Sequence, residues 1–254
     1  MTLYELDAYF NSFLKKENFC ADPSRNGIQI QNSAPDKKKI KKVAFAVDAS
    51  LDTAQEAARQ GCDVLFVHHG LYWDNCEIMT DLHYQRVATF IKNDMALIGY
   101  HIPLDANKEA GNNWGMAKRL GLKACKDFCS WRGMTLGVKG RLPKAMSIEE
   151  LSKAALNGAK PNQLLPFGKK KIQTVGIVSG GGGSDHWAAW KEGLDAYITG
   201  EIGHTDWNYI KEEGINVIAG GHYNTETVGV QLVMKKLKEE KGIQGLFLDF
   251  PTGM

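Results

Sequence analysis

The sequence lacks the features by which membrane and secreted proteins are recognised. No stretch approaches the roughly eighteen uninterrupted apolar residues that a membrane-spanning helix needs. The first residues do not combine a basic region with an apolar core, so we expect no signal peptide. The five cysteines are scattered and form no C-x-x-C pair, which indicates reduced thiols. We therefore expect a cytoplasmic protein with no membrane partner.

The chain also lacks an excess of charge of either sign. It carries 31 lysines and arginines against 29 aspartates and glutamates. A protein built mainly to hold nucleic acid usually shows a clear basic excess, so a nucleic-acid partner is disfavoured. The length of 254 residues and a hydrophobic fraction of 43% allow one large domain or two small ones, each with its own core.

Strands and helices are predicted to alternate along most of the chain. Apolar residues at helical spacing predict an opening amphipathic helix over residues 3–14. Further helices are expected at 51–60, 82–92, 185–192, 205–213 and 225–240, and strands at 42–48, 63–67, 95–100, 174–178, 195–199, 215–219 and 245–250. Alternation of this kind implies parallel strands joined by helical crossovers.

The second run of elements repeats the first, which predicts an internal duplication. Val43 and Val175 begin matching strands, and residues 61–63 and 193–195 follow them at the same spacing. We therefore expect an α/β fold of two pseudo-symmetric halves with largely parallel sheets.

The expected boundaries follow from this repeat. The first half would span residues 1–130 and the second residues 172–254, with 131–171 as a connector or small subdomain. The halves could also pack as one domain.

Metal-ligating residue types follow the predicted strands. Two segments have the form His-x-x-x-carboxylate, and a third places two adjacent histidines after a strand: the residues are His101 with Asp105, His222 with Glu226, and His68 with His69. Imidazole and carboxylate together bind Zn, Mn or Fe. Because ligands gather outside the carboxyl ends of parallel strands, these residues predict a metal site in a cleft there.

The number of candidate ligands favours two metal ions. Four protein ligands close a structural zinc site, whereas a catalytic pair about 3.5 to 4 Å apart needs more, including a bridging carboxylate. Either Asp105 or Glu226 could bridge; we favour Glu226, which opens a predicted helix four residues after His222. A water between two such cations is acidified and can attack a phosphoryl or carbon centre.

Two nearby segments leave alternatives open. Residues 179–184 form a glycine-rich link between a strand and a helix, which could hold an anion through its N–H groups or could be a tight turn. Glu201, at the end of another predicted strand, could move protons or could be a solvated loop residue.

In this order the segments resemble the Nif-three-like family, whose members are catalogued as GTP cyclohydrolase 1 type 2 homologues. The segments are residues 68–70, 99–105, 199–201 and 221–226, with 25–29 and 180–183 as further likenesses. The resemblance covers nearly the whole chain and is to the short form of the family, without a large inserted domain. It implies a two-domain-like α/β fold with pseudo-symmetry, a dinuclear metal centre and a homohexameric ring.

The resemblance also implies site residues. The metal ligands would be His68, His69, Asp105, His222 and Glu226, holding two divalent ions (Zn, Fe or Mn) in each subunit. His101 would then support a ligand or act in catalysis.

The function expected on these grounds is that of a metal-dependent hydrolase like GTP cyclohydrolase 1 type 2. Its substrate would be a nucleotide or a phosphorylated small molecule, and His101 or Glu201 would move protons. The alternative is a non-catalytic metal-binding ring with a metal-trafficking or regulatory role.

Overall fold

The opening helix forms where the sequence predicts it. In the computed structural model, which describes residues 1–75 and 77–254, helix α1 spans Leu3–Leu14. Thr2 caps it by accepting a hydrogen bond from the backbone N–H of Glu5, whose carboxylate accepts one from the backbone N–H of Thr2. Its buried face includes Leu6 and Phe10.

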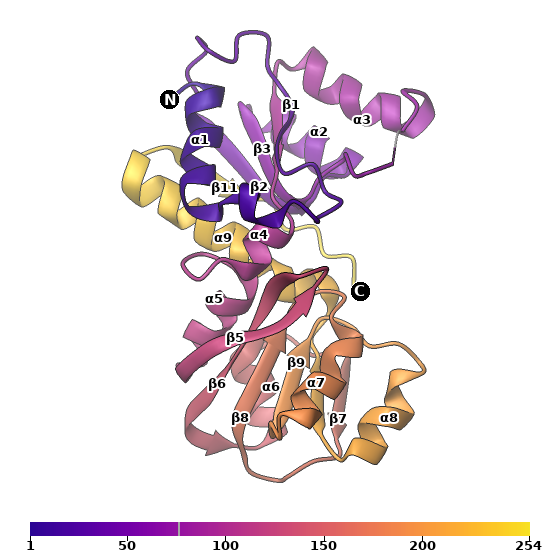
Figure 1. The fold of residues 1–254 in the computed structure, drawn as a ribbon. Helices are drawn as coiled ribbons and strands as arrows, with labels where there is room; N and C mark the ends of the chain where they lie inside the picture. The colour runs from indigo at the N-terminus through magenta and orange to yellow at the C-terminus, as the bar shows by residue number, and fades with distance from the viewer. Residues whose placement is uncertain (76) are drawn as a thin grey trace. The chain divides into compact units, whose positions relative to one another are not determined.

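The other helices and strands expected from the sequence also form close to their predicted places, and further elements that were not expected lie between them (Figure 1). The helices are α2 (Leu51–Arg59), α3 (Asp81–Lys92), α4 (Ile102–Ala106), α5 (Asn112–Arg119), α6 (Ile148–Ala155), α7 (His186–Lys191), α8 (Asp206–Glu213) and α9 (His222–Lys241), with short 3-10 helices at Lys16–Phe19 and Gly183–Asp185. The strands are β1 (Gly27–Ile30), β2 (Lys42–Asp48), β3 (Val64–His69), β4 (Ala96–Gly99), β5 (Lys123–Trp131), β6 (Met134–Met146), β7 (Gln163–Pro166), β8 (Ile172–Val178), β9 (Ala196–Thr199), β10 (Asn216–Ala219) and β11 (Gln244–Phe247). The predicted mixed α/β fold is confirmed.

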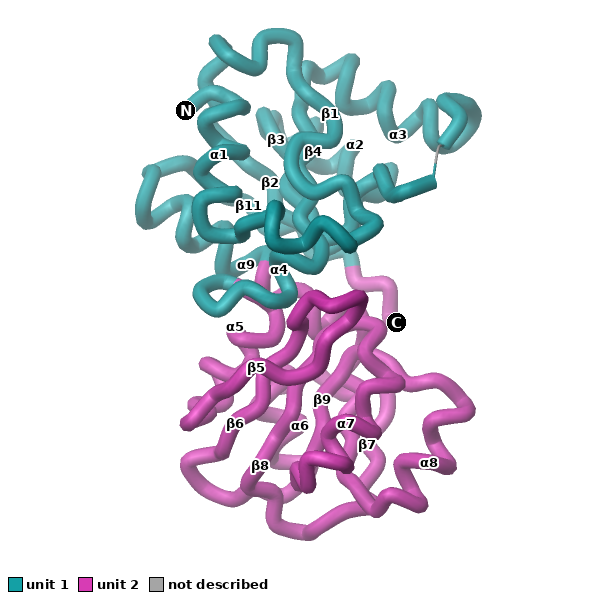
Figure 2. The backbone as a smooth tube through the Cα atoms, in the orientation of Figure 1, with its two compact units in different colours: residues 1–110, 230–250 teal, residues 111–229, 251–254 magenta. Residues whose placement is uncertain are grey.

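These elements build two units (Figure 2). Unit 1 consists of residues 1–110 and 230–250, and unit 2 of residues 111–229 and 251–254. The units differ from the boundaries expected from the sequence. Segment 131–171 supplies β6, α6 and β7 to unit 2, and the chain returns to unit 1 because β11 pairs with β2. Such long-range pairing leaves no local pattern in the sequence.

Unit 1 is a five-stranded sheet in the order β1-β4-β3-β2-β11 with helices on both faces. Strands β11, β2, β3 and β4 are parallel, and β1 is antiparallel to β4. Apolar side chains of α2 and α3 pack on one face. On the other face Phe10 of α1 lies on Phe66 of β3, with ring centroids 4.7 Å apart. The sheet is therefore buried on both faces, as its nearly continuous apolar strands require.

Unit 2 is a six-stranded sheet in the order β5-β6-β8-β9-β10-β7. Strands β8, β9 and β10 are parallel, whereas β5, β6 and β7 join through antiparallel pairings. The expected parallel character therefore holds for the centre of this sheet only. Apolar residues of α5 and α6 pack on one face, and α7 lies against β9 (Figure 1).

The central strands of the two sheets are arranged in the same way. Val43 of β2 lies opposite Val64, and the matching Val175 of β8 lies opposite Ala196, so the paired strands keep one register in both units. In each unit the third parallel strand, β4 or β10, carries an antiparallel neighbour on its outer side, β1 or β7. This correspondence is what the predicted duplication requires.

Membrane and disulfide features are absent from the part of the chain that the structure describes. None of its helices is both long and apolar enough to cross a membrane. Cys20, Cys62, Cys125 and Cys129 are free thiols, and Cys76 lies outside the described residues.

Candidate metal centre

In each unit the predicted ligands lie at the carboxyl ends of parallel strands. In unit 1, His68 and His69 are the last two residues of β3, His101 follows β4, and Asp105 lies in α4. In unit 2, Glu201 follows β9, and α9 begins with His222, the third residue after β10, and includes Glu226. As predicted, these residues lie at the carboxyl ends of the strands or in the segments that follow them.

Three histidines of unit 1 form a cluster. The ligand nitrogens of His68, His69 and His101 lie within 4.8 Å of one another. The ring centroids of His68 and His101 are 5.2 Å apart, and those of His69 and His101 are 5.7 Å apart. Consecutive residues of a regular strand point to opposite faces, yet His68 and His69 reach the same space at the end of β3. The cluster can therefore offer several nitrogens to one ion.

Hydrogen bonds fix the orientation of each imidazole. The Nδ1 atom of each ring lies beside an oxygen acceptor: the Tyr100 carbonyl for His68 at 3.1 Å, Asp48 Oδ1 for His69 at 2.8 Å, and Asp22 Oδ1 for His101 at 2.9 Å. Since these acceptors take a proton from Nδ1, the lone pair of each ring is on Nε2. Metal-binding histidines usually show this arrangement, with a carboxylate or carbonyl behind the ring.

A buried carboxylate completes the set in unit 1. Asp105 is 7% exposed, and its Oδ2 lies 3.5 Å from Nε2 of His68. A carboxylate oxygen and a nitrogen lone pair repel each other unless a proton or a cation lies between them. Imidazole nitrogens with a carboxylate oxygen are the donors that Zn, Fe and Mn accept, so the residues of unit 1 fit a divalent metal ion.

Unit 2 contributes a histidine between two carboxylates. Nε2 of His222 lies 3.2 Å from Oε1 of Glu226, and Nδ1 lies 3.2 Å from Oε1 of Glu201. The hydrogen bond to Glu226, supported by Glu201 and opposed by burial, raises the pKa of His222 to about 9. The site thus attracts positive charge. A metal ion bound at Nε2 would take the place of a proton, so binding would release protons.

The glycine-rich segment supports Glu226. Gly180 has φ +62°, and a Cβ there would lie 2.0 Å from Oε1 of Glu226. Its N–H donates to Oγ1 of Thr225 at 3.0 Å, and its carbonyl accepts from the N–H groups of Gly200 and Glu201. Of the two alternatives left open by the sequence, these contacts favour a tight turn that lets the first turn of α9 approach closely.

Two carboxylates beside the histidines were not predicted. Asp22 has a fully buried side chain and accepts hydrogen bonds from Nδ1 of His101 and from the backbone N–H of Ile102 and Ser24. Burial raises the pKa of Asp22, but these bonds outweigh it and the pKa is lowered. Asp48 holds His69 in the same way. Asp22 lies in a loop and Asp48 at a strand end, where no periodicity marks them; only the nearby segment 25–29 drew attention to this region.

Asp48→Ala is expected to lower the affinity for divalent metal about tenfold to hundredfold, the usual effect of removing the partner behind a ligating histidine. Stability should change little, because the side chain of Asp48 is 36% exposed. Chelator competition measures the affinity. Asp52→Ala, at an exposed position in the first turn of α2, is the control. Equal affinities for the two variants would show that Asp48 does not orient a ligand.

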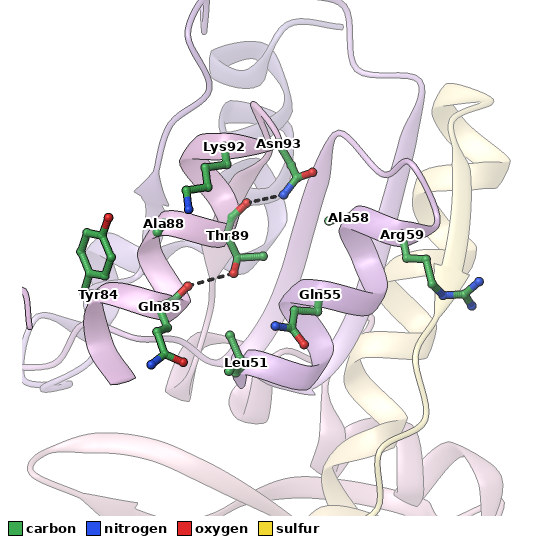
Figure 3. A pocket seen from close by; sticks show the side chains of 10 residues that line it. All are labelled: Leu51, Gln55, Ala58, Arg59, Tyr84, Gln85, Ala88, Thr89, Lys92 and Asn93. Atoms are coloured by element: carbon green, nitrogen blue, oxygen red, sulfur yellow. Dashed lines mark hydrogen bonds between the residues drawn. The ribbon is translucent and has the colours of Figure 1, made fainter. Parts of the chain in front are cut away.

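Each unit also contains a cavity, and the one in unit 2 is lined by the candidate residue Glu201. A groove of about 500 Å³ lies between α2 and α3, and Figure 3 shows side chains of the two helices on either side of it. No imidazole or carboxylate lines this groove, so it cannot be the metal site. A cavity of about 360 Å³ in unit 2 is lined by Glu201, Asp206 and Gly181, among others. Glu201 thus contacts both this cavity and His222.

Comparison with known proteins places this arrangement in a family. A sequence profile of Duf34/NIF3 (NGG1p interacting factor 3) matches residues 1–251. The chain belongs to the Duf34/NIF3 family. The resemblance inferred from the sequence is thereby confirmed.

Relatives and solved structures agree with this assignment. Proteins named "GTP cyclohydrolase 1 type 2 homolog" from Treponema pallidum and Deinococcus radiodurans are 42% and 41% identical to the chain. The first match covers 100% of both chains, and the second covers 92% of this chain and 88% of the relative. The crystal structure of a Thermus thermophilus protein is similar with a TM-score of 0.87 and 34% identity over 100% of both chains. The Duf34/NIF3 fold therefore extends over the whole chain.

Proposed function

We propose that this Duf34/NIF3 protein is a metal-dependent hydrolase with a dinuclear centre of Zn, Fe or Mn. The proposed ligands are His68, His69 and Asp105 of unit 1 and His222 and Glu226 of unit 2. The observation that supports the proposal most directly is the cluster of imidazoles in unit 1, each held through Nδ1. Metal-ligating histidines almost always donate their other ring N–H to a carboxylate or a carbonyl in this way.

Asp105 and Glu226 both lie close in sequence to points where the chain passes from one unit to the other. Asp105 lies shortly before the chain first crosses from unit 1 to unit 2, at residues 110 and 111. Glu226 lies shortly before the second crossing, at residues 229 and 230, inside the continuous helix α9. Each carboxylate is therefore only a few residues from a point where the chain passes between the units.

The protein side chains have separate tasks in this proposal. Two divalent ions, when bound, would acidify a water toward neutral pH and neutralise developing negative charge. His101 is held by Asp22 through Nδ1, which leaves Nε2 to accept or donate a proton. Glu201 fixes Nδ1 of His222 and also faces the cavity of unit 2, where it can exchange a proton with a bound molecule.

The proposed substrate is a nucleotide or another phosphorylated small molecule. The name of these relatives makes GTP the first compound to test.

We also propose a cytoplasmic protein that assembles into a homohexamer. Large apolar side chains that are candidates for such contacts are exposed in both units, such as Ile91 at 66% and Trp187 at 48%. Light scattering should then give a mass about six times 28.1 kDa.

Turnover by metal-loaded protein tests the proposed activity. A panel of GTP, other nucleotides and phosphoesters should contain at least one compound whose hydrolysis requires metal. His69→Ala and Glu226→Ala should each lower that rate at least about a hundredfold, because each removes a predicted ligand of the ions that activate the water. Tight metal binding without turnover of any compound would contradict a hydrolase and favour the metal-trafficking or regulatory ring.

A further inference from the structure

A cavity of about 380 Å³ in unit 1 adjoins the histidine cluster through one tryptophan. The indole of Trp73 lines the cavity and also lies edge-on to the ring of His101, with centroids 4.9 Å apart. Its centroid is 6.4 Å from that of His69. The indole Nε1 donates to the carbonyl of Gly70 at 3.1 Å, which fixes the plane of the ring. A molecule bound against Trp73 would therefore be close to two candidate site residues.

The walls of the cavity are held by hydrogen bonds to the main chain. Oε1 of Gln29 accepts from the N–H groups of Leu71 and Tyr72 at 2.8 and 3.2 Å, and Nε2 donates to the carbonyl of Arg25. The N–H of Arg25 in turn donates to the carbonyl of Tyr72 at 3.0 Å. A Cβ at Gly70 would lie 2.2 Å from Nε2 of Gln29, so a larger residue there would displace the amide of Gln29. The cavity is thus formed before any ligand arrives, which lowers the entropic cost of binding.

Arg25, at the rim of the cavity, forms only a weak ion pair. Nη2 of Arg25 lies 3.5 Å from Oδ1 of Asp74, and the two side chains are 66% and 61% exposed. Exposed ion pairs of this kind contribute little to stability. A phosphate could therefore replace Asp74 as the partner of Arg25, and a guanidinium binds phosphate through two parallel N–H groups.

We propose that this cavity binds a nucleotide, with the base stacked on Trp73 and a phosphate on Arg25. The inference rests on the proposed function, since it names the substrate class and where that substrate is held. Aromatic side chains beside arginine bind nucleotides through base stacking and charge. The volume is within the range of about 300 to 1,000 Å³ that is usual for small-ligand sites. The nucleotide base would lie beside His101, within reach of the cluster.

Calorimetric titration of the full chain with GMP, AMP, guanosine and inorganic phosphate tests this site, with metal-free and metal-loaded protein in parallel. Nucleotides should bind in both states. Trp73→Ala should weaken their binding at least about tenfold, whereas Trp73→Phe, which keeps a ring, should stay within about threefold of the native chain. Arg25→Gln should weaken GMP and AMP but leave guanosine unchanged. Trp190→Ala, at an exposed position of α7 in unit 2, is the matched control.

Three results would overturn the inference. They are no nucleotide binding in either state, nucleotide binding by Trp73→Ala and Arg25→Gln that is as tight as that of the native chain, and phosphate binding as tight as that of GMP. If Trp73→Ala loses its fold by circular dichroism, Arg25→Gln and Trp73→Phe decide the question. The proposed function fails separately: nucleotide binding with this pattern but without metal or turnover would leave the binding site standing and remove the hydrolase.

Discussion

Glu226→Gln is expected to weaken metal binding at least about a hundredfold and to leave at most one tightly bound ion per chain. The substitution keeps the shape of the side chain but removes its negative charge and an anionic oxygen, and an amide oxygen is a poor ligand for Zn or Fe. Glu226 is only 3% exposed, and its Oε1 lies 3.2 Å from Nε2 of His222. An exposed side chain therefore cannot move into its place. Equilibrium dialysis followed by elemental analysis measures the bound metal.

The same helix provides the control for this prediction. Glu239→Gln removes an equal charge from α9 at a position where the side chain is 62% exposed and pairs only with solvent-exposed Lys235 among the ion pairs described. This variant should bind metal as the native chain does. If Glu226→Gln and Glu239→Gln retain the same metal content, Glu226 is not a ligand and the proposed bridging role is wrong.

Gly180→Ala should both destabilise unit 2 and impair metal binding. A left-handed backbone conformation at a residue other than glycine costs about 1 kcal/mol. The added Cβ would in addition lie 2.0 Å from Oε1 of Glu226, so the carboxylate or the turn must shift. We expect a loss of about 2 to 4 kcal/mol in the free energy of unfolding, together with weaker metal binding. Denaturant titration and chelator competition measure the two effects.

A second glycine separates backbone strain from the collision with Glu226. Gly193 has φ +67°, close to that of Gly180, but a Cβ there would meet nothing within 4 Å. Gly193→Ala should therefore cost only the backbone strain, about 1 kcal/mol, and leave metal affinity unchanged. Equal effects of the two substitutions on metal affinity would show that Gly180 does not position Glu226.

The local parts of the fold could be predicted because they depend on neighbouring residues. The spacing of apolar residues located α1, and the apolar runs located β2, β3 and β4 to within a few residues. The strand-end positions of His68, His69 and His222 then followed, since parallel strands bring their carboxyl ends to one edge. This is why the ligand types could be recognised before the fold was known.

Other parts depend on contacts between distant residues and could not be predicted. Strands β1 and β7 lie at the edges of their sheets and are only partly buried, so they lack the continuous apolar run that located the equally short β4. The return of residues 230–250 to unit 1 depends on the pairing of β11 with β2 across most of the chain. The roles of Asp22 and Asp48 depend on which histidine each one faces, and spacing along the sequence does not contain that information.

His101 and His222 show that the likeness between the two halves does not extend to the details of the site. In the sequence both His101 and His222 begin a His-x-x-x-carboxylate segment that follows a predicted strand. In the structure His101 is the second residue after β4, whereas His222 is the third after β10. His101 is held by Asp22, and its ligand atoms lie close to those of His68 and His69, while His222 lies between two carboxylates. The two histidines therefore have different surroundings.

Anomalous diffraction from crystals of the full chain, recorded at the Zn, Fe and Mn absorption edges, tests the central claim most directly. The account predicts two metal peaks per chain, bound by Nε2 of His68, His69 and His222 and by the carboxylates of Asp105 and Glu226. The Nδ1 atoms of His68 and His69 should remain on the Tyr100 carbonyl and on Asp48. Metal-replete crystals without a peak at these residues, or with the metal on Nδ1, would contradict it.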